Sequence, residues 1–398
     1  MERNFTIVIS GYYGFGNSGD EAVLHAILQS LREQADAAGI RIRPVVLSID
    51  PSATERMHGV RAVHRMKLGD MFRALKESDG LVSGGGSLLQ DLTGIRTIPY
   101  YLGVIKLAQW LGKPTFIYAQ GMGPIRNRMY YPMIRGVFRR CAYISMRDEE
   151  SVQLLRDIGL RDMRIDVAAD PVMGLRLPAA EGAAEGKGPG DAGAAIAESA
   201  AERPYSGPAG YSVSTDEPLI GVAAREWHDE RRDLNQLAEA LRLVLERRPN
   251  ARLRFLPFHP PKDEAAARYI MHRLGESYAH RISMCPGSDD PKRMFDEVGR
   301  CSLLIGMRLH SLIYAASLRI PMVGISYDPK IDYFLRRLQM PVAGSTLHIE
   351  PEHLAAQALQ LLDERDQWIA AKSPLIEELQ KKSQIPAQHI CQYLRNRG

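Results

Sequence analysis

Apolar and polar positions follow two alternating periods along the first half of the chain. Short apolar runs, typical of buried parallel strands, are followed by segments in which apolar residues recur every three or four positions. After Asp20, a predicted N-cap, Leu24, Ile27, Leu28 and Leu31 fall on one helical face. Strands are predicted at residues 5–10, 43–49, 80–83, 115–119, 142–145 and 165–168, with helices such as 99–111 and 149–158 between them. This alternation predicts a parallel sheet covered by helices.

The alternation stops once and then resumes. Residues 178–210 are rich in Ala, Gly and Pro and hold too few large apolar side chains to offset the entropy of ordering them. Further strands are predicted at 219–224, 253–256, 281–284, 302–305 and 321–325. We therefore predict an α/β fold with two Rossmann-like domains facing a cleft, an N-terminal domain at 1–172 and a C-terminal domain with a helical tail at 218–398. A linker with a low-complexity insertion, at 173–217, would join them.

Composition narrows the class of protein. The 398 residues include 51 Lys and Arg against 47 Asp and Glu, a net charge of +4, which is unlike a dedicated nucleic-acid-binding protein. The four cysteines form no C-x-x-C pair and fit reduced thiols better than disulfides or a zinc site. The first strand follows Met1 closely, without a leader-like apolar region, and no apolar run has the length of a membrane-spanning helix. We expect a cytoplasmic protein that has no bound metal and contacts a membrane only peripherally.

Two glycine-rich turns follow predicted strands. Residues 14–19 match G-x-G-x-x-G, the fingerprint of dinucleotide binding, but Asp20 and Glu21 at the helix start would repel a pyrophosphate. A capped turn that only permits close packing is one interpretation, and we prefer a polar loop in which Asn17 and Asp20 bind substrate hydroxyls. The turn at 84–87 allows either a tight bend or close backbone approach to a ligand.

Cations stand at the ends of three predicted strands, at Arg147, at Arg308 and His310, and at Lys330. Extended backbone would place Arg308 and His310 on the same side. Arginine and lysine bind carboxylates or phosphates, and histidine exchanges a proton near neutral pH. Although each alone is more typical of a surface ion pair or a structural histidine, their coincidence at carboxyl ends predicts a site for an anionic substrate. His259 is a weaker candidate for this site.

A basic stretch lies outside this cluster. Residues 125–140 contain five arginines, among them Arg126 and Arg128, interleaved with Tyr, Met and Phe and without an acid. The pattern is typical of a solvated helix face, and it also fits contact with an anionic membrane or a lipid-linked diphosphate.

Six motifs in order along nearly the whole chain resemble the polysaccharide pyruvyl transferases, most closely the cell-wall enzymes of S-layer-bearing Gram-positive bacteria. They are GFGNSGDE (14–21), GGGS (84–87), QGMGP (120–124), MRD (146–148), ADP (169–171) and MRLH (307–310). The resemblance implies a GT-B-like pair of domains and transfer of pyruvate from phosphoenolpyruvate, a co-substrate rather than a cofactor. The product would be a 4,6-ketal of N-acetylmannosamine on a lipid-linked ManNAc-GlcNAc diphosphate, the precursor of a secondary cell-wall polysaccharide that anchors the S-layer.

Roles follow from this resemblance and the predicted cation cluster. Arg147, Arg308 and Lys330 would bind the donor with help from Tyr327 and Ser311, and His310 would be the general acid. The predicted acceptor ligands are Phe15, Asn17, Asp20, Gly84, Gly85 and Gln90. The carboxylate that stabilises positive charge at C2 could be Asp148, Asp170 or Asp328.

Three other functions remain open. A GT-B glycosyltransferase that uses a nucleotide sugar would share the fold and the cations at strand ends. A non-catalytic protein that binds glycans or lipid diphosphates would need no proton-exchanging His310. A dehydrogenase would use the turn at 14–19 for a dinucleotide.

Overall fold

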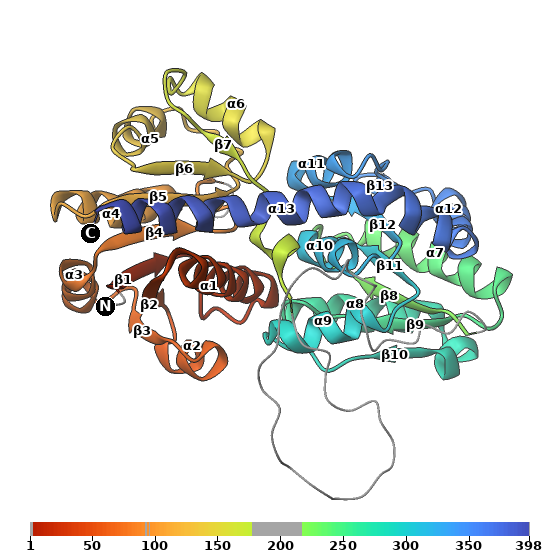
Figure 1. The fold of residues 1–398 in the computed structure, drawn as a ribbon. Helices are drawn as coiled ribbons and strands as arrows, with labels where there is room; N and C mark the ends of the chain where they lie inside the picture. The colour runs from red at the N-terminus through yellow and green to blue at the C-terminus, as the bar shows by residue number, and fades with distance from the viewer. Residues whose placement is uncertain (1–2, 92–93, 95, 177–216, 398) are drawn as a thin grey trace, which may run out of the picture.

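The strands of the computed structural model, which describes residues 3–91, 94, 96–176 and 217–397, form two sheets (Figure 1). The strand order is β3-β2-β1-β4-β5-β6-β7 in the first sheet and β10-β9-β8-β11-β12-β13 in the second, and all neighbours are parallel. Each sheet thus has the doubly wound order in which the first strand lies beside the fourth. The predicted α/β class, with parallel sheets covered by helices, is confirmed.

The elements follow the predicted alternation. The first sheet contains β1 (Arg3–Ser10), β2 (Ile40–Ser48), β3 (Arg61–His64), β4 (Gly80–Gly84), β5 (Thr115–Gln120), β6 (Tyr143–Met146) and β7 (Asp166–Val167). Its helices are α1 (Ser18–Ala38), α2 (Pro51–His58), α3 (Leu68–Glu77), α4 (Thr97–Trp110), α5 (Tyr130–Phe138) and α6 (Glu149–Asp157), followed by the 3₁₀ helix η1 (Pro171–Gly174). All six strands predicted in this half overlap an observed strand. The short edge strand β3 was not predicted, because it contains no long apolar run.

The second half repeats the arrangement. Its strands are β8 (Leu219–Ala223), β9 (Arg252–Phe255), β10 (Ile282–Met284), β11 (Leu303–Gly306), β12 (Met322–Ser326) and β13 (Gly344–Ser345). Its helices are α7 (Arg232–Arg247), α8 (Lys262–Leu274), η2 (Glu276–Arg281), α9 (Pro291–Gly299), α10 (Leu309–Ser317), α11 (Pro329–Arg337), α12 (Pro351–Asp363) and α13 (Arg365–Arg397). Only the two-residue edge strand β13 lacks a predicted counterpart.

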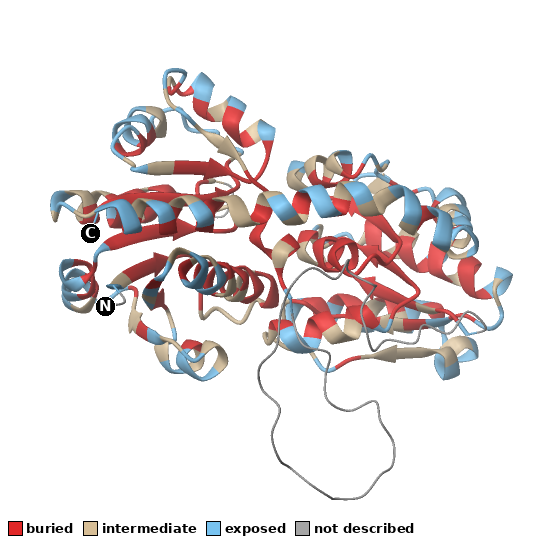
Figure 2. Cartoon of the chain, in the orientation of Figure 1, coloured by how far each residue is buried: buried red, intermediate tan, exposed pale blue. Residues whose placement is uncertain are grey.

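Apolar side chains form three buried clusters. One lies between the first sheet and helices α3 to α6, and another lies between the second sheet and helices α7, α8 and α12. The third joins the halves, because it contains residues of β1, α1, α10 and α13. Figure 2 accordingly shows buried strands and helices that are exposed on their outer faces. None of the helices within the described residues is both long and apolar enough to cross a membrane.

The last helix, α13, returns from the second sheet to the first, so the C-terminus lies near the N-terminus (Figure 1). Ile390 and Leu394 are buried there, and the Tyr393 ring packs edge-on against Phe116 of β5 with centroids 5.2 Å apart. The helical tail assigned to the C-terminal domain therefore also covers the first sheet. The predicted bounds 1–172 and 218–398 stay predictions, and most of the predicted linker lies outside the described residues.

Candidate active site between the two sheets

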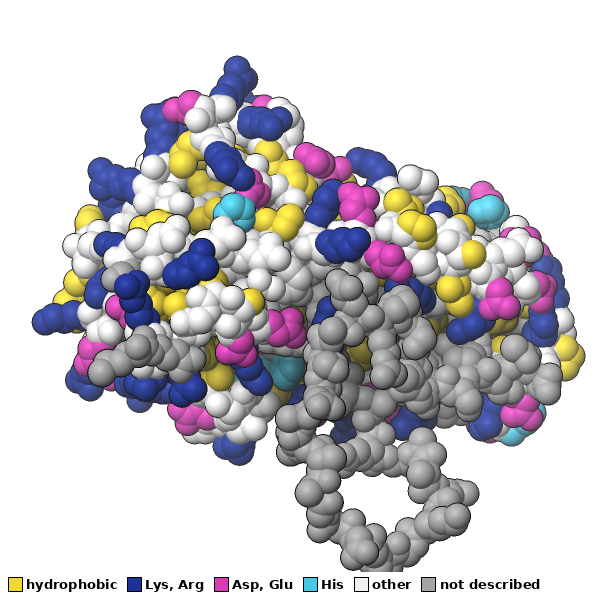
Figure 3. Space-filling view, viewed as in Figure 1, with side chains coloured by type: hydrophobic (Ala, Val, Ile, Leu, Met, Phe, Trp, Pro, Cys, Tyr) yellow, Lys and Arg dark blue, Asp and Glu magenta, His cyan; other side chains and the backbone are white. Residues whose placement is uncertain are grey.

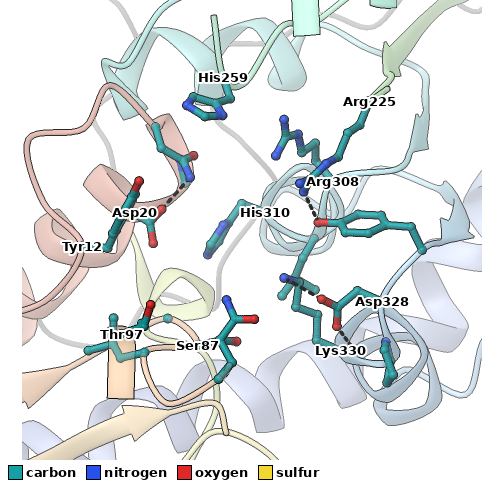
Figure 4. Close-up of a pocket in the computed structure, with 18 of the residues that line it drawn as sticks. Tyr12, Asp20, Ser87, Thr97, Arg225, His259, Arg308, His310, Asp328 and Lys330 are labelled. Atoms are coloured by element: carbon teal, nitrogen blue, oxygen red, sulfur yellow. Dashed lines mark hydrogen bonds and ion pairs between the residues drawn. The ribbon is translucent and has the colours of Figure 1, made fainter. Parts of the chain in front are cut away.

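A pocket of about 930 Å³ lies between the two sheets, at the carboxyl ends of their strands. This is where open α/β sheets bind ligands. In Figure 4, His310 lies between Asp20 and Ser87 of the first half and the cations Arg308 and Lys330 of the second. The predicted site residues that line the pocket are Asn17, Asp20, Gln90, Arg147, Arg308, His310, Tyr327 and Lys330. The fold therefore brings together the predicted cations from three strand ends.

The first turn of α1 forms the acidic side of the pocket. The helix begins at Ser18, and its N-cap is Asn17, whose Oδ1 accepts the Gly19 N–H at 3.1 Å. The predicted N-cap at Asp20 was therefore wrong. Both residue types cap helices, and the apolar stripe alone does not distinguish between starts three residues apart. Asp20 instead lines the pocket, where the Asn17 side-chain amide donates to its Oδ2 at 2.5 Å.

The two carboxylates at this helix start have different surroundings. Burial, followed by the neighbouring Glu21, raises the pKa of Asp20 to about 7. Glu21 accepts the Gly14 N–H at 2.7 Å through Oε1, and its Oε2 lies 3.0 Å from His58 Nε2. Glu21 thus holds the glycine-rich loop, whereas Asp20 can gain or lose a proton near neutral pH within the pocket.

The start of α1 also touches the second half directly. The Ser18 N–H and hydroxyl donate to the Phe258 carbonyl at 3.3 and 3.0 Å, and the Tyr314 hydroxyl donates to the Ser18 carbonyl at 3.4 Å. A Cβ added at Gly19 would collide with His310 Nδ1 and approach its Cγ at 2.7 Å. Only glycine therefore lets the helix approach His310 this closely.

Each predicted donor cation is paired with a carboxylate. Arg147 lies 3.3 Å from both Asp148 and Asp170, and it donates to Ser87 Oγ at 2.9 Å. The other two pairs are Arg308 with Asp263, formed through Nε and Nη2 of the guanidinium, and Lys330 with Asp328 at 3.2 Å. These acids fix the cations in place before a ligand arrives. Within the described residues, no cluster of three or more His, Cys, Asp or Glu side chains could hold a metal ion.

His310 stands in the first turn of α10, so the expectation of extended backbone through Arg308 and His310 was wrong. Arg308 is the extended N-cap residue, and the helix starts at Leu309. His310 Nε2 is buried without a hydrogen-bond partner and lies 3.9 Å from Asp170 Oδ2. Burial lowers the pKa of His310 to about 4, against the opposing effect of Asp170. The imidazole is therefore neutral at pH 7 in the ligand-free pocket.

Four predicted ligands do not line the pocket. Ser311 is buried, and its hydroxyl donates to the Arg308 carbonyl at 2.6 Å. Phe15 stacks on the pocket residue Tyr12 with ring centroids 4.0 Å apart. Gly84 belongs to β4, and an added Cβ on Gly85 would collide with Val23 of α1. The roles of these four positions as ligands stay predictions.

Other pocket residues were not singled out from the sequence, chiefly Tyr12, Tyr101, Arg225 and Trp227. Arg225 follows β8 almost directly, which is the same signal of a cation after an apolar strand that identified Arg147. The aromatic residues carry no comparable signal, because tyrosine and tryptophan are common in cores and on surfaces alike. His259, the weaker candidate, does line the pocket.

Comparisons with known proteins agree with this arrangement. The polysaccharide pyruvyl transferase family matches residues 17–329 of the chain. The UDP-GlcNAc 2-epimerase of Neisseria meningitidis, solved with UDP-GlcNAc, has a similar structure with a TM-score of 0.63 and 9% identity over 97% of this chain and 99% of that one. ADP-heptose LPS heptosyltransferase II of E. coli is also similar, with a TM-score of 0.51 and 14% identity over 92% and 100% of the two chains. These likenesses show a GT-B-type fold.

We predict that Gly19→Ala destabilises the protein. Alanine normally stabilises a helix relative to glycine by roughly 0.5–1 kcal/mol, but here the methyl group must displace His310, and overpacking costs about 1–3 kcal/mol. Gly103→Ala in α4 is the matched control, because its added Cβ would meet nothing within 4 Å. In urea denaturation, the unfolding midpoint of Gly19→Ala should lie at a lower urea concentration than that of the parent. The midpoint of Gly103→Ala should lie at the same concentration or a higher one. A Gly19→Ala variant as stable as its control would contradict the observed contact.

Proposed function

Because this chain belongs to the polysaccharide pyruvyl transferase family, we propose that it moves pyruvate from phosphoenolpyruvate onto the 4- and 6-hydroxyls of an N-acetylmannosamine. The acceptor is a lipid-linked ManNAc-GlcNAc diphosphate, from which a secondary cell-wall polysaccharide is built, and the leaving group is phosphate. The resulting ketal carries a carboxylate that gives the polymer the negative charge used to anchor an S-layer.

The cation cluster around His310 carries this proposal. Phosphoenolpyruvate has a carboxylate and a phosphate close together, and Arg147, Arg308 and Lys330 offer positive charge from three strand ends of one pocket. The two anionic groups of phosphoenolpyruvate match this set of cations, which supports the small donor.

His310 acts as the general acid. The bound donor adds negative charge next to the imidazole and raises its pKa, so that His310 takes up a proton as the donor binds. It then protonates the methylene carbon, and the first sugar hydroxyl attacks C2. Phosphate leaves, and the second hydroxyl closes the ketal. The two sugar hydroxyls release two protons. One replaces the proton that His310 gave to the methylene carbon, and the other leaves with phosphate.

Two carboxylates assist this chemistry. We assign the stabilisation of positive charge at C2 to Asp170, because its Oδ2 lies 3.9 Å from His310 Nε2 and pairs with Arg147 at 3.3 Å. Asp20, with its pKa near neutrality, accepts a proton from a sugar hydroxyl, and Asn17 and Gln90 orient the sugar.

The acceptor's lipid places the reaction at the inner face of the membrane. Arg126 lines the pocket, and the same basic stretch continues through Arg128 to Met129 and Met133, which are 79% and 46% exposed. Figure 3 shows Lys and Arg side chains projecting at the upper left, the region of α5 in Figure 1. Exposed apolar side chains among cations are typical of peripheral contact with anionic lipid.

We expect the parent to release phosphate from phosphoenolpyruvate when given a short-chain ManNAc-GlcNAc-diphosphate lipid. His310→Ala should lose at least about a hundredfold in kcat, the usual contribution of general acid catalysis, and Lys330→Ala should mainly raise the KM for phosphoenolpyruvate. His348→Ala, an exposed histidine, is the control. Near-normal turnover by His310→Ala would contradict the assignment of His310 as the general acid. Protection from thermal unfolding by UDP-sugars but not by phosphoenolpyruvate would favour a glycosyltransferase, and glycan binding without phosphate release would favour a binding protein.

Membrane contact is tested by sedimentation with phosphatidylglycerol vesicles. The parent should bind them, more weakly as salt rises, and the double variant Arg128→Glu/Met129→Glu should lose at least about tenfold in affinity, since each basic residue contributes about 1 kcal/mol near an anionic surface. The double variant Lys292→Ala/Arg300→Glu, at exposed positions in the second half, changes the charge by the same three units and should bind like the parent. Equal binding by both variants would contradict the assigned surface.

A further inference from the structure

Three side chains on the second-sheet side of the pocket form a cation–aromatic group, and two of them, Arg225 and Trp227, have no part in the proposed donor chemistry. Arg225 and Trp227 follow β8, and Tyr327 follows β12. The Arg225 guanidinium carbon lies 4.7 Å from the Trp227 ring centroid and 4.5 Å from that of Tyr327. Arg225 Nη1 also donates to the Tyr327 hydroxyl at 2.7 Å (Figure 4). These contacts hold the guanidinium in a defined orientation at the pocket wall.

Arg225 differs from the predicted donor cations in its ion-pair partners. Arg147, Arg308 and Lys330 each have a carboxylate partner, whereas no ion pair joins Arg225 to a carboxylate within the described parts of the chain. Burial, opposed by Tyr327 and reinforced by the neighbouring Arg308, lowers the pKa of Arg225. A partly buried guanidinium without an acid partner is stabilised when an anion binds to it.

Trp227 extends this group with an apolar surface. Its side chain is 42% exposed although it lines the pocket, and its ring lies 4.6 Å from that of Tyr327. An exposed aromatic face in a pocket suits the apolar face of a sugar ring, and the adjacent guanidinium suits a phosphate. The pocket volume also lies near the top of the roughly 300–1,000 Å³ typical of ligand sites, which is more than the small donor needs.

We propose that Arg225, Trp227 and Tyr327 form a glycosyl-phosphate subsite that holds the reducing-end sugar and first phosphate of the acceptor. This inference rests on the proposed function and extends it. Trp227 stacks on the sugar, Arg225 binds the phosphate, and Tyr327 positions Arg225. The acceptor therefore crosses the pocket, from its reacting sugar beside Asp20 to its phosphate beside the second sheet.

The test compares two acceptors that differ only in phosphate, a short-chain ManNAc-GlcNAc diphosphate and the alkyl glycoside of the same disaccharide. Arg225→Gln should raise the KM for the diphosphate at least about tenfold, because it removes a charge-assisted contact. The KM values for phosphoenolpyruvate and for the alkyl glycoside should stay within about twofold. Trp227→Ala should weaken the binding of both acceptors, and Trp227→Phe should recover part of the lost affinity. Arg231→Gln is the matched control, since Arg231 packs on Tyr269 at 4.8 Å outside the pocket.

Several outcomes would overturn this subsite. A raised KM for phosphoenolpyruvate in Arg225→Gln would assign Arg225 to the donor, and equal losses with both acceptors would make its role structural. Calorimetric binding of the diphosphate acceptor, without donor, separates the subsite from the reaction. Binding that depends on Arg225 would support the subsite even if no phosphate were released, an outcome that would refute only the proposed transfer. Binding independent of Arg225, or preferential Arg225-dependent binding of UDP-sugars, would refute the acceptor subsite.

Discussion

The close approach of helix α1 to the second sheet is the constraint on which the pocket depends. The backbone of Ser18 is bonded to Phe258 and Tyr314, and Gly19 leaves space only for the His310 ring. Because α1, α10 and α13 share one apolar cluster, this contact is supported by the core. Arg337 of α11 adds hydrogen bonds to the carbonyls of Arg147 and Ala168. Residues from both halves are thereby held around one space instead of on separate surfaces.

The same closeness determines the protonation of the pocket. Burial removes water from Asp20 and His310 and disfavours the charged form of each, so the carboxyl and the imidazole are both shifted toward neutrality. The cations nearby stay fixed by their own acids. The pocket therefore combines fixed cations with two groups able to exchange protons. In the proposed transfer, the cations bind the anionic donor and the two groups move protons to the donor and from the neutral sugar.

Residues that are local to a strand or to its end could be predicted from the sequence. The apolar runs identified both sheets, and the cations after them identified Arg147, Arg308, His310 and Lys330. Properties that depend on contacts across the molecule could not be predicted. The choice between Asn17 and Asp20 as N-cap depends on which side chain faces the pocket, and the return of α13 to Phe116 depends on tertiary packing. The packing of Arg225 against both Trp227 and Tyr327 joins two strand ends that are far apart in the chain.

Calorimetric titration of the full chain with phosphoenolpyruvate, at pH 7 in two buffers of different ionisation enthalpy, tests most directly whether the pocket is a donor site built around His310. The account predicts saturable binding with net proton uptake, because the donor's charge raises the pKa of a buried imidazole that is neutral beforehand. His310→Gln should bind with clearly less proton uptake, because only the contribution of Asp20, whose pKa is about 7, would remain. An absence of saturable binding, or proton uptake unchanged in His310→Gln, would contradict it.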